Sequence, residues 1–189
     1  MNFENDIQPC ISILKSGGII LYPTDTVWGI GCDATNDEAV AKIYALKKRQ
    51  ESKSMIVLVG EEQDILKYTQ QPSIKVYDYI KGLQKPVTVI YQNAFNLSQN
   101  IINEDGSIGI RVVNDKFCKI LLQQFGKPIV STSANISGFP TPLIFSDIDL
   151  LIKKGVDYIV QYRQEETAPA QPSAIIKIND DGSYTTIRA

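Results

Sequence analysis

The sequence predicts an α/β fold, a single domain with a twisted mixed sheet and flanking helices. Short apolar runs typical of strands alternate along the chain with segments of helical periodicity. The 189 residues are enough for one core, and 43% hydrophobic with 21% charged residues is ordinary for a globular protein. Neither an internal repeat nor a low-complexity linker divides the chain, so we expect residues 1–189 to form one domain.

The predicted elements begin with a helix over 6–15, which has apolar residues at helical spacing and is stopped by Gly17 and Gly18. A buried strand over 18–21 and a polar turn follow. Thr35 and Glu38 have the spacing of a capping box, which predicts that a second helix starts there. The later elements are strands over 55–59, 87–91, 107–113 and 128–131, helices over 61–68, 73–83, 116–125 and 146–154, and C-terminal strands over 158–161, 174–178 and 184–187, the last two joined by a turn at 181–182.

The composition excludes several kinds of chemistry. The chain has no histidine, which removes Ser-His-Asp catalysis and His-ligated metals. Cys10, Cys32 and Cys118 are far apart, so neither a disulfide framework nor a thiolate zinc site is indicated, and a reducing cytoplasmic setting fits. No apolar run is long enough for a membrane helix, and no signal peptide is recognised at the N-terminus. The patterns GxxxxGK[ST] and GxGxxG are absent, so the common nucleotide-binding loops are not predicted.

Cations gather where the second predicted helix ends, at Lys47, Lys48, Arg49 and Lys53. A substrate that carries phosphates needs such charges, and arginine can hold a phosphate through two hydrogen bonds. The same run is also typical of a solvated helix end whose charges match the helix dipole. The spacing alone leaves both interpretations open.

Two polar turns follow predicted strands, where α/β folds expose ligand-binding loops. One spans 131–135 and the other 24–26, and their hydroxyl and amide groups suit a phosphate or a sugar, although ordinary turns and helix caps have the same composition. Arg111 interrupts an apolar strand, either as an exposed alternate residue or as a cation directed into a pocket. We interpret Trp28 and Cys32 as packing residues.

Six stretches together resemble the YrdC/TsaC family, the L-threonylcarbamoyladenylate synthases. They are YPTDTVWGIGCDA at 22–34, LKKR at 46–49, KPVTVIY at 85–91, GIRVV at 109–113, KPIVSTSANISGFP at 127–140 and PSAIIKI at 172–178. They occur in the family's order, and its Lys-x-Arg and Ser-x-Asn signature corresponds to Lys47 with Arg49 and Ser133 with Asn135. The resemblance implies the family's fold, a twisted α/β sheet with a deep concave cleft.

The resemblance also implies an enzyme that makes an activated product in two steps. L-threonine and bicarbonate form N-carboxy-threonine, whose carboxylate attacks the α-phosphate of ATP to give threonylcarbamoyl-AMP and pyrophosphate. A TsaD-type partner would then transfer the threonylcarbamoyl group to tRNA. Mg²⁺ is expected to arrive with ATP, with no metal ligand from protein side chains.

The family pattern implies a role for particular residues. Lys47 and Arg49 would be catalytic; Lys53, Thr88, Ser131, Ser133 and Asn135 would bind ATP; Thr24, Thr26, Arg111 and Ser173 would contact threonine. Attack by a ready carboxylate needs positioning and charge neutralisation, and no side-chain nucleophile, which suits a chain without histidine. Gln50, Lys53 and Leu58 depart from the family's usual proline, asparagine and, in many long members, histidine.

Two other functions stay open. One is a double-stranded RNA or tRNA-binding module without catalysis, or at least a weak contact with tRNA; the net charge of −2 disfavours it, because RNA affinity depends on neutralising phosphates. The other is a carbamoyl-handling relative of hydrogenase maturation, where the domain is normally fused to others. Residues 164–172, QEETAPAQP, are predicted to be a flexible surface segment that could close over a substrate.

Overall fold

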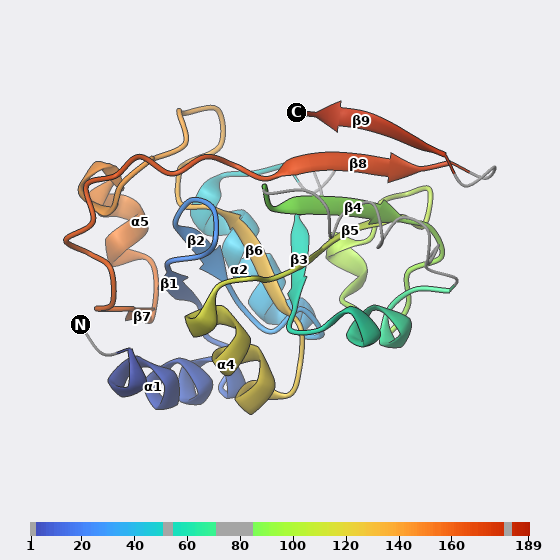
Figure 1. The fold of residues 1–189 in the computed structure, drawn as a ribbon. Helices are drawn as coiled ribbons and strands as arrows, with labels where there is room; N and C mark the ends of the chain where they lie inside the picture. The colour runs from blue at the N-terminus through green and yellow to red at the C-terminus, as the bar shows by residue number, and fades with distance from the viewer. Residues whose placement is uncertain (1–2, 51–54, 71–84, 180–182) are drawn as a thin grey trace.

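The computed structural model describes residues 3–50, 55–70, 85–179 and 183–189. Lys53, the predicted helix over 73–83 and the predicted turn at 181–182 lie outside these ranges. Within them, helices and strands alternate along most of the chain, as Figure 1 shows.

The strands are β1 (Ile20–Tyr22), β2 (Gly29–Gly31), β3 (Ile56–Val59), β4 (Val87–Tyr91), β5 (Ile108–Val112), β6 (Ile129–Ser133), β7 (Tyr158–Ile159), β8 (Ala174–Ile178) and β9 (Tyr184–Arg188). In the described residues they form one nine-stranded sheet in the order β7-β1-β2-β6-β3-β5-β4-β8-β9. The pairs β1–β7, β3–β5 and β4–β8 are parallel and the others antiparallel, so the sheet is mixed, as predicted.

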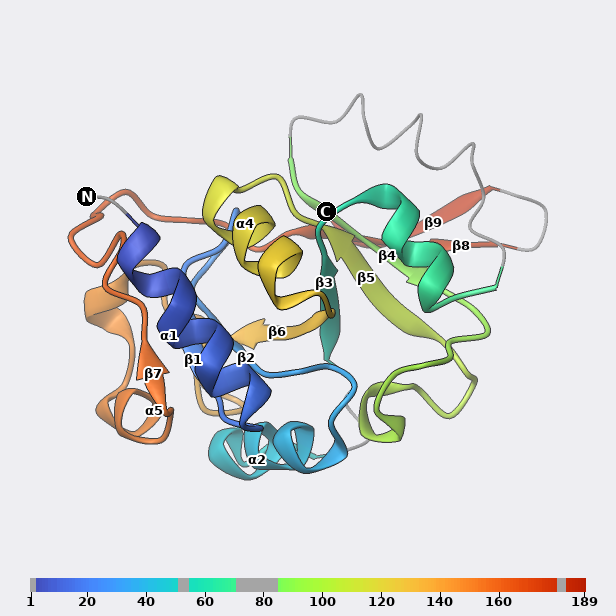
Figure 2. The ribbon, with the colours of Figure 1, turned by 90° about the horizontal axis from the view of Figure 1, so that it is seen from below.

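Helices lie on both sides of the sheet. They are α1 (Glu4–Lys15), α2 (Asp37–Lys47), α4 (Lys116–Phe125) and α5 (Leu150–Lys154), with 3-10 turns η1 (Glu62–Lys67), η2 (Gln99–Ile101) and η3 (Phe145–Asp147). Figure 2 shows α1 and α4 side by side on one face, and α2 on the opposite side of β6. Each turns an apolar stripe inward, for example Leu14 of α1 and Leu121 of α4, which are buried. Trp28 and Cys32 are buried too, as the sequence indicated.

Several local predictions were wrong. The strand β2 was not predicted, because its two glycines are residues that strands disfavour. The second helix is capped by Asn36, whose side chain accepts from the Ala39 N–H at 3.0 Å, and not by Thr35. The predicted helix over 61–68 is the 3-10 turn η1. The predicted helix over 146–154 is two pieces, because Asp149 caps a new helix by accepting from the Leu151 N–H at 2.7 Å.

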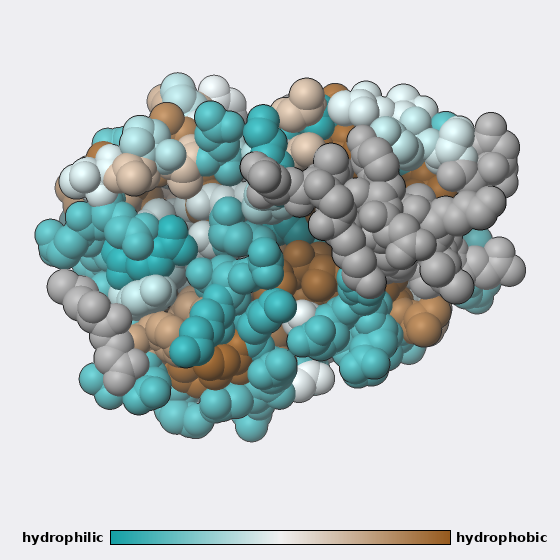
Figure 3. All heavy atoms as spheres, viewed as in Figure 1, coloured by the Kyte–Doolittle hydropathy of each residue, from teal (hydrophilic) through white to brown (hydrophobic). Residues whose placement is uncertain are grey.

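Hydrophilic side chains cover most of the face drawn in Figure 3, with an apolar area where α1 meets α4. In the described ranges, every helix is too short or too polar to cross a bilayer.

Candidate functional site

A cavity of about 240 Å³ opens beside β2, β5, β6 and the C-terminal strands. Its described lining contains three arginines, Arg49, Arg111 and Arg188, and no carboxylate. We call it the arginine cavity. The three arginines are distant in sequence. Arg111 lies on β5 and Arg188 on β9, which the sheet order places on either side of β4 and β8, and Arg49 follows the end of α2.

The structure brings most of the sequence-predicted residues to this cavity. Six of them line it: Thr26, Arg49, Arg111, Ser131, Ser133 and Ser173. Four more stand directly behind and are each hydrogen-bonded to a lining residue: Thr24 to Thr26, Thr88 to Ser173, and both Lys47 and Asn135 to Ser133. The cationic helix end and the 131–135 turn therefore converge on one hollow.

Two hydroxyls that line the cavity, those of Thr26 and Ser173, are each hydrogen-bonded to a hydroxyl behind them. Thr24 Oγ1 donates its proton to the Val27 carbonyl at 2.8 Å, so the Thr26 hydroxyl is the donor in the 2.9 Å contact between the two threonines. This leaves the lone pairs of the Thr26 oxygen available to a ligand. The second pair is Thr88 and Ser173, whose hydroxyl oxygens are 2.9 Å apart.

Arg111 is a fixed cation on β5, and its side chain is only 3% exposed. Its Nη2 lies 3.1 Å from Asp25 Oδ1 and 3.5 Å from Thr24 Oγ1. Its Nε has no hydrogen-bond partner among the described residues. Because an unsatisfied buried N–H is costly, this group is a candidate to receive an acceptor atom of a ligand.

Lys47 does not line the cavity. Its side chain is buried, and Nζ donates to the backbone carbonyls of Ser133 and Asn135, the latter at 2.6 Å. Burial, and secondly the charge of Arg49, lower the pKa of Lys47 to about 7. A solvated helix end is therefore excluded for Lys47, whereas its neighbour Lys48 is exposed.

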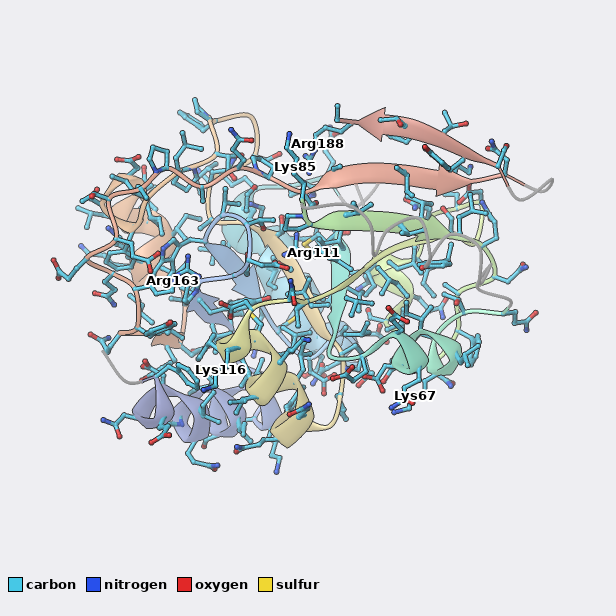
Figure 4. The ribbon with its side chains drawn as sticks, viewed as in Figure 1. Lys67, Lys85, Arg111, Lys116, Arg163 and Arg188 are labelled. Atoms are coloured by element: carbon cyan, nitrogen blue, oxygen red, sulfur yellow. The ribbon has the colours of Figure 1, made fainter. Side chains whose placement is uncertain are left out.

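Sequence reasoning missed Arg188. Its Nε and Nη2 donate to the Ser173 carbonyl at 3.0 and 2.8 Å, which holds the guanidinium at the cavity. Figure 4 shows Arg188, from β9, above Arg111. No sequence pattern marks Arg188 as a site residue, because it is simply the last residue but one of the chain, after a short predicted strand.

For two of the three arginines, burial disfavours the charged form. Burial lowers the pKa of Arg49, and burial followed by the charge of Arg111 lowers the pKa of Arg188. Both shifts mean that the surroundings disfavour positive charge. An anionic ligand would relieve this, so the arginine cavity is built to receive one.

A larger hollow, of about 1020 Å³, lies on the other face of β5, since Ile110 and Val112 line it while Arg111 points the opposite way. Figure 3 shows apolar side chains over β3 and β5 in this region. Five carboxylates line the hollow against three cations: Asp25, Glu61, Glu62, Asp115 and Glu166 against Lys85, Lys119 and Arg163. This excess of negative charge does not suit a polyanion, so we place the functional site in the smaller cavity.

Comparisons with known proteins agree on one family. The family model Sua5/YciO/YrdC, described as telomere recombination, matches residues 12–189. The threonylcarbamoyl-AMP synthase of Pseudoalteromonas translucida (strain TAC 125) is 33% identical over 178 residues, which covers 93% of this chain and 94% of that protein.

Two solved structures are similar in fold. Sua5 of P. abyssi, complexed with L-threonine, superposes with a TM-score of 0.85 at 19% identity; the match covers 98% of this chain but only 54% of the Sua5 chain. E. coli YciO superposes with a TM-score of 0.82 at 21% identity, covering 97% of this chain and 88% of that one. The predicted YrdC-like α/β sheet is thus confirmed.

Proposed function

Because the chain belongs to the Sua5/YciO/YrdC family, we propose that it is an L-threonylcarbamoyladenylate synthase. It combines L-threonine, bicarbonate and ATP into threonylcarbamoyl-AMP and releases water and pyrophosphate. The observation that carries this proposal is the arginine cavity itself, where the buried Arg111, the half-buried Arg49 and the exposed Arg188 meet several hydroxyls without a carboxylate among the described lining residues.

The charges suit a triphosphate. Guanidinium groups can each hold phosphate oxygens through paired hydrogen bonds, and their effect is strong where water is excluded. Arg49 and Arg188, whose pKa values are lowered by burial, regain a favourable environment when an anion arrives. We assign these two arginines to the phosphates.

The second set of groups suits an amino acid with a hydroxyl. Arg111 offers an unpartnered Nε to the carboxylate of threonine, and Thr26 or Ser173 offers a hydroxyl partner to its side chain. A site that hydrogen-bonds a hydroxyl rejects an analogue that lacks it, because the site's own polar groups are then left unpaired.

The chain's own side chains do not need to act as the nucleophile. The carboxylate of N-carboxy-threonine forms the new bond to the α-phosphorus, and the bond from that phosphorus to the oxygen of pyrophosphate breaks. The thiols are unsuited to this role: burial raises the pKa of Cys10 to about 12 and also raises the pKa values of Cys32 and Cys118. The protein contributes positioning and charge neutralisation.

We propose that Mg²⁺ arrives with the nucleotide. Among the described residues, no group of three His, Cys, Asp or Glu side chains is arranged to hold a metal ion. Magnesium commonly keeps several waters and is bound largely through substrate phosphates. When bound, it would supply further neutralisation of phosphate charge, while the arginines and hydroxyls position the reactants.

The product requires a partner. Threonylcarbamoyl-AMP is a mixed anhydride, so a transferase has to consume it, and a TsaD-type enzyme that modifies tRNA in the cytoplasm is the partner we propose. The net charge of −2 supports at most a weak contact between this chain and tRNA.

The deciding experiment is mass spectrometry of the product formed from ATP, bicarbonate and L-threonine, with L-serine as competitor and pyrophosphate release measured in parallel. We expect threonylcarbamoyl-AMP, with threonine preferred, and loss of turnover in Arg49→Ala with little change in melting temperature. Tight, salt-sensitive tRNA binding without threonine-dependent pyrophosphate release would instead favour the RNA-binding module.

A further inference from the structure

The turn formed by residues 133–139, which we call the signature turn, contains hydrogen bonds between its own side chains and backbone. Ser133 Oγ donates to Asn135 Oδ1 at 2.5 Å. The Asn135 amide donates to the carbonyls of Ile136 at 3.1 Å and Phe139 at 2.6 Å. Both N–H groups of this amide are therefore used inside the turn, and the Asn135 side chain does not line the arginine cavity.

Lys47 fastens the same turn from beneath. Its Nζ donates to the Ser133 and Asn135 carbonyls, and its own carbonyl accepts from the Ser137 N–H at 2.8 Å. One residue at the end of α2 thus bonds to three alternate positions of the signature turn. Its side chain is only 1% exposed, so these contacts are made without competition from water.

The charge state of Lys47 does not matter for these contacts. A neutral amine keeps two N–H groups, which is the number that the two carbonyls require. A pKa lowered to about 7 would make Lys47 a poor permanent cation for a phosphate, but it leaves this bonding intact. Arg49, two residues along, lines the cavity and remains a cation at neutral pH.

We propose that the four signature residues divide into two pairs: Arg49 and Ser133 face the ligand, whereas Lys47 and Asn135 are positioning residues that hold the signature turn in shape. This inference rests on the proposed function in one respect, because it takes the ligand to be ATP. The shape of the turn itself is a property of the protein without nucleotide.

The test is amide hydrogen exchange of the ligand-free protein at Asn135, Ser137 and Phe139, whose N–H groups are all donors in or beneath the turn. Lys47→Met should speed exchange at these amides by about tenfold or more, because the turn opens more often. Lys48→Met is the matched control, since it makes the same substitution at an exposed neighbour, and it should exchange like wild type. Unchanged exchange in a folded Lys47→Met protein overturns the proposal.

ATP titrations separate the two pairs. At about pH 8, where Lys47 is mostly neutral, Arg49→Ala should reduce the salt dependence of ATP affinity, because a screened charge contact is lost. Lys47→Met should lower the affinity for ATP but leave the salt dependence of that affinity unchanged. A reduced salt dependence would mark Lys47 as a phosphate ligand and overturn the proposal.

If circular dichroism shows that Lys47→Met does not fold, Asn135→Ala carries the same test, with faster exchange at Ser137 and Phe139 expected and wild-type exchange contradicting it. The exchange experiment contains no nucleotide. If wild type failed to bind ATP, the proposed function would be wrong, but the exchange experiment would still show whether Lys47 holds the signature turn.

Discussion

Arg111, which lines the arginine cavity, forms a largely buried ion pair with Asp25, which lines the larger hollow. The Asp25 side chain is 10% exposed, and its Oδ2 accepts from the Asn114 N–H at 3.1 Å, so the carboxylate is held from two directions. The family resemblance implied a threonine contact for Arg111 and was silent on Asp25. The sequence shows that these residues are polar, but their pairing across 86 positions depends on the packing of the 24–26 turn on β5.

Asp25→Asn tests this pair. The amide keeps the shape and the bond from Asn114 but leaves Arg111 buried without a counter-charge, so we expect a loss of about 3 kcal/mol in the free energy of unfolding. The KM for threonine should rise more than the KM for ATP. Asp105→Asn is the control, since its pair with Lys177, at 3.6 Å, is exposed and should contribute less than about 1 kcal/mol. Equal losses in chemical denaturation would refute the argument.

Lys47 gives stability a defined dependence on pH. Its pKa is 10.5 in an ordinary environment and about 7 in the folded protein. Between these values the unfolded chain binds more protons, so the free energy of unfolding should rise with pH there, by up to about 1.4 kcal/mol per pH unit.

The measurement is urea denaturation of wild type and Lys47→Met between about pH 6 and pH 10. Burial raises the pKa values of Cys10, Cys32 and Tyr22, which lowers stability as pH increases, but it does so in both proteins. The difference between the two curves therefore isolates Lys47. Parallel curves would show that its pKa is not lowered.

At the scale of elements, α4 was predicted within its observed bounds, because its signals are local. Asp115 accepts from the Cys118 N–H at 2.8 Å and starts the helix, and Gly126 ends it with φ of 77°. The strand β2 shows the opposite case. Gly29 and Gly31 lack the side chains by which strands are recognised, and what requires them is a neighbour distant in sequence.

Gly31→Ala tests that requirement. A Cβ at Gly31 would lie 2.6 Å from both the Val130 carbonyl oxygen and the Tyr22 ring. Overpacking of this kind costs about 1–3 kcal/mol, which predicts a melting temperature lower by roughly 2–10 °C in a chain of this size. Gly60→Ala is the control, because the nearest atom there, in Leu122, would be at 3.7 Å. A melting temperature of Gly31→Ala equal to that of Gly60→Ala would contradict the packing argument.

At the scale of the whole molecule, the site exists because distant parts of the chain close on one another. Arg188 reaches it only through the pairing of β9 with β8 and of β8 with β4. The order of the strands is set by the packing of the complete sheet. The hydrophobic periodicity within one segment therefore cannot reveal which strands will be neighbours. This is why sequence reasoning found the polar turns of the site but not the cation that comes from the C-terminal strand.

The return of the chain after β7 depends on Arg163. Its Nη1 donates to the Thr24 carbonyl at 2.9 Å and lies 3.5 Å from Asp115, while its Nε bonds Glu166 at 2.7 Å. Further along, the Ala170 N–H bonds the Leu143 carbonyl at 3.1 Å. Residues 164–172 are thus fastened at both ends and lead directly to Ser173 in the cavity. That they move over a substrate stays a prediction.

Arg163→Gln should release the first of these attachments. We expect cleavage after Glu165 or Glu166 by a glutamate-specific protease to become about tenfold faster, because local opening exposes the segment. The KM for threonine should also rise, since the Thr24 carbonyl loses the donor that fixes its turn.

Lys67→Gln is the control: its ion pair with Asp64 is exposed, and Figure 4 shows Lys67 on the opposite side of the molecule from Arg163. If added threonine slows cleavage of wild type but not of Arg163→Gln, the segment closes on the ligand through this arginine. Cleavage at the rate of Lys67→Gln would mean that other contacts hold it.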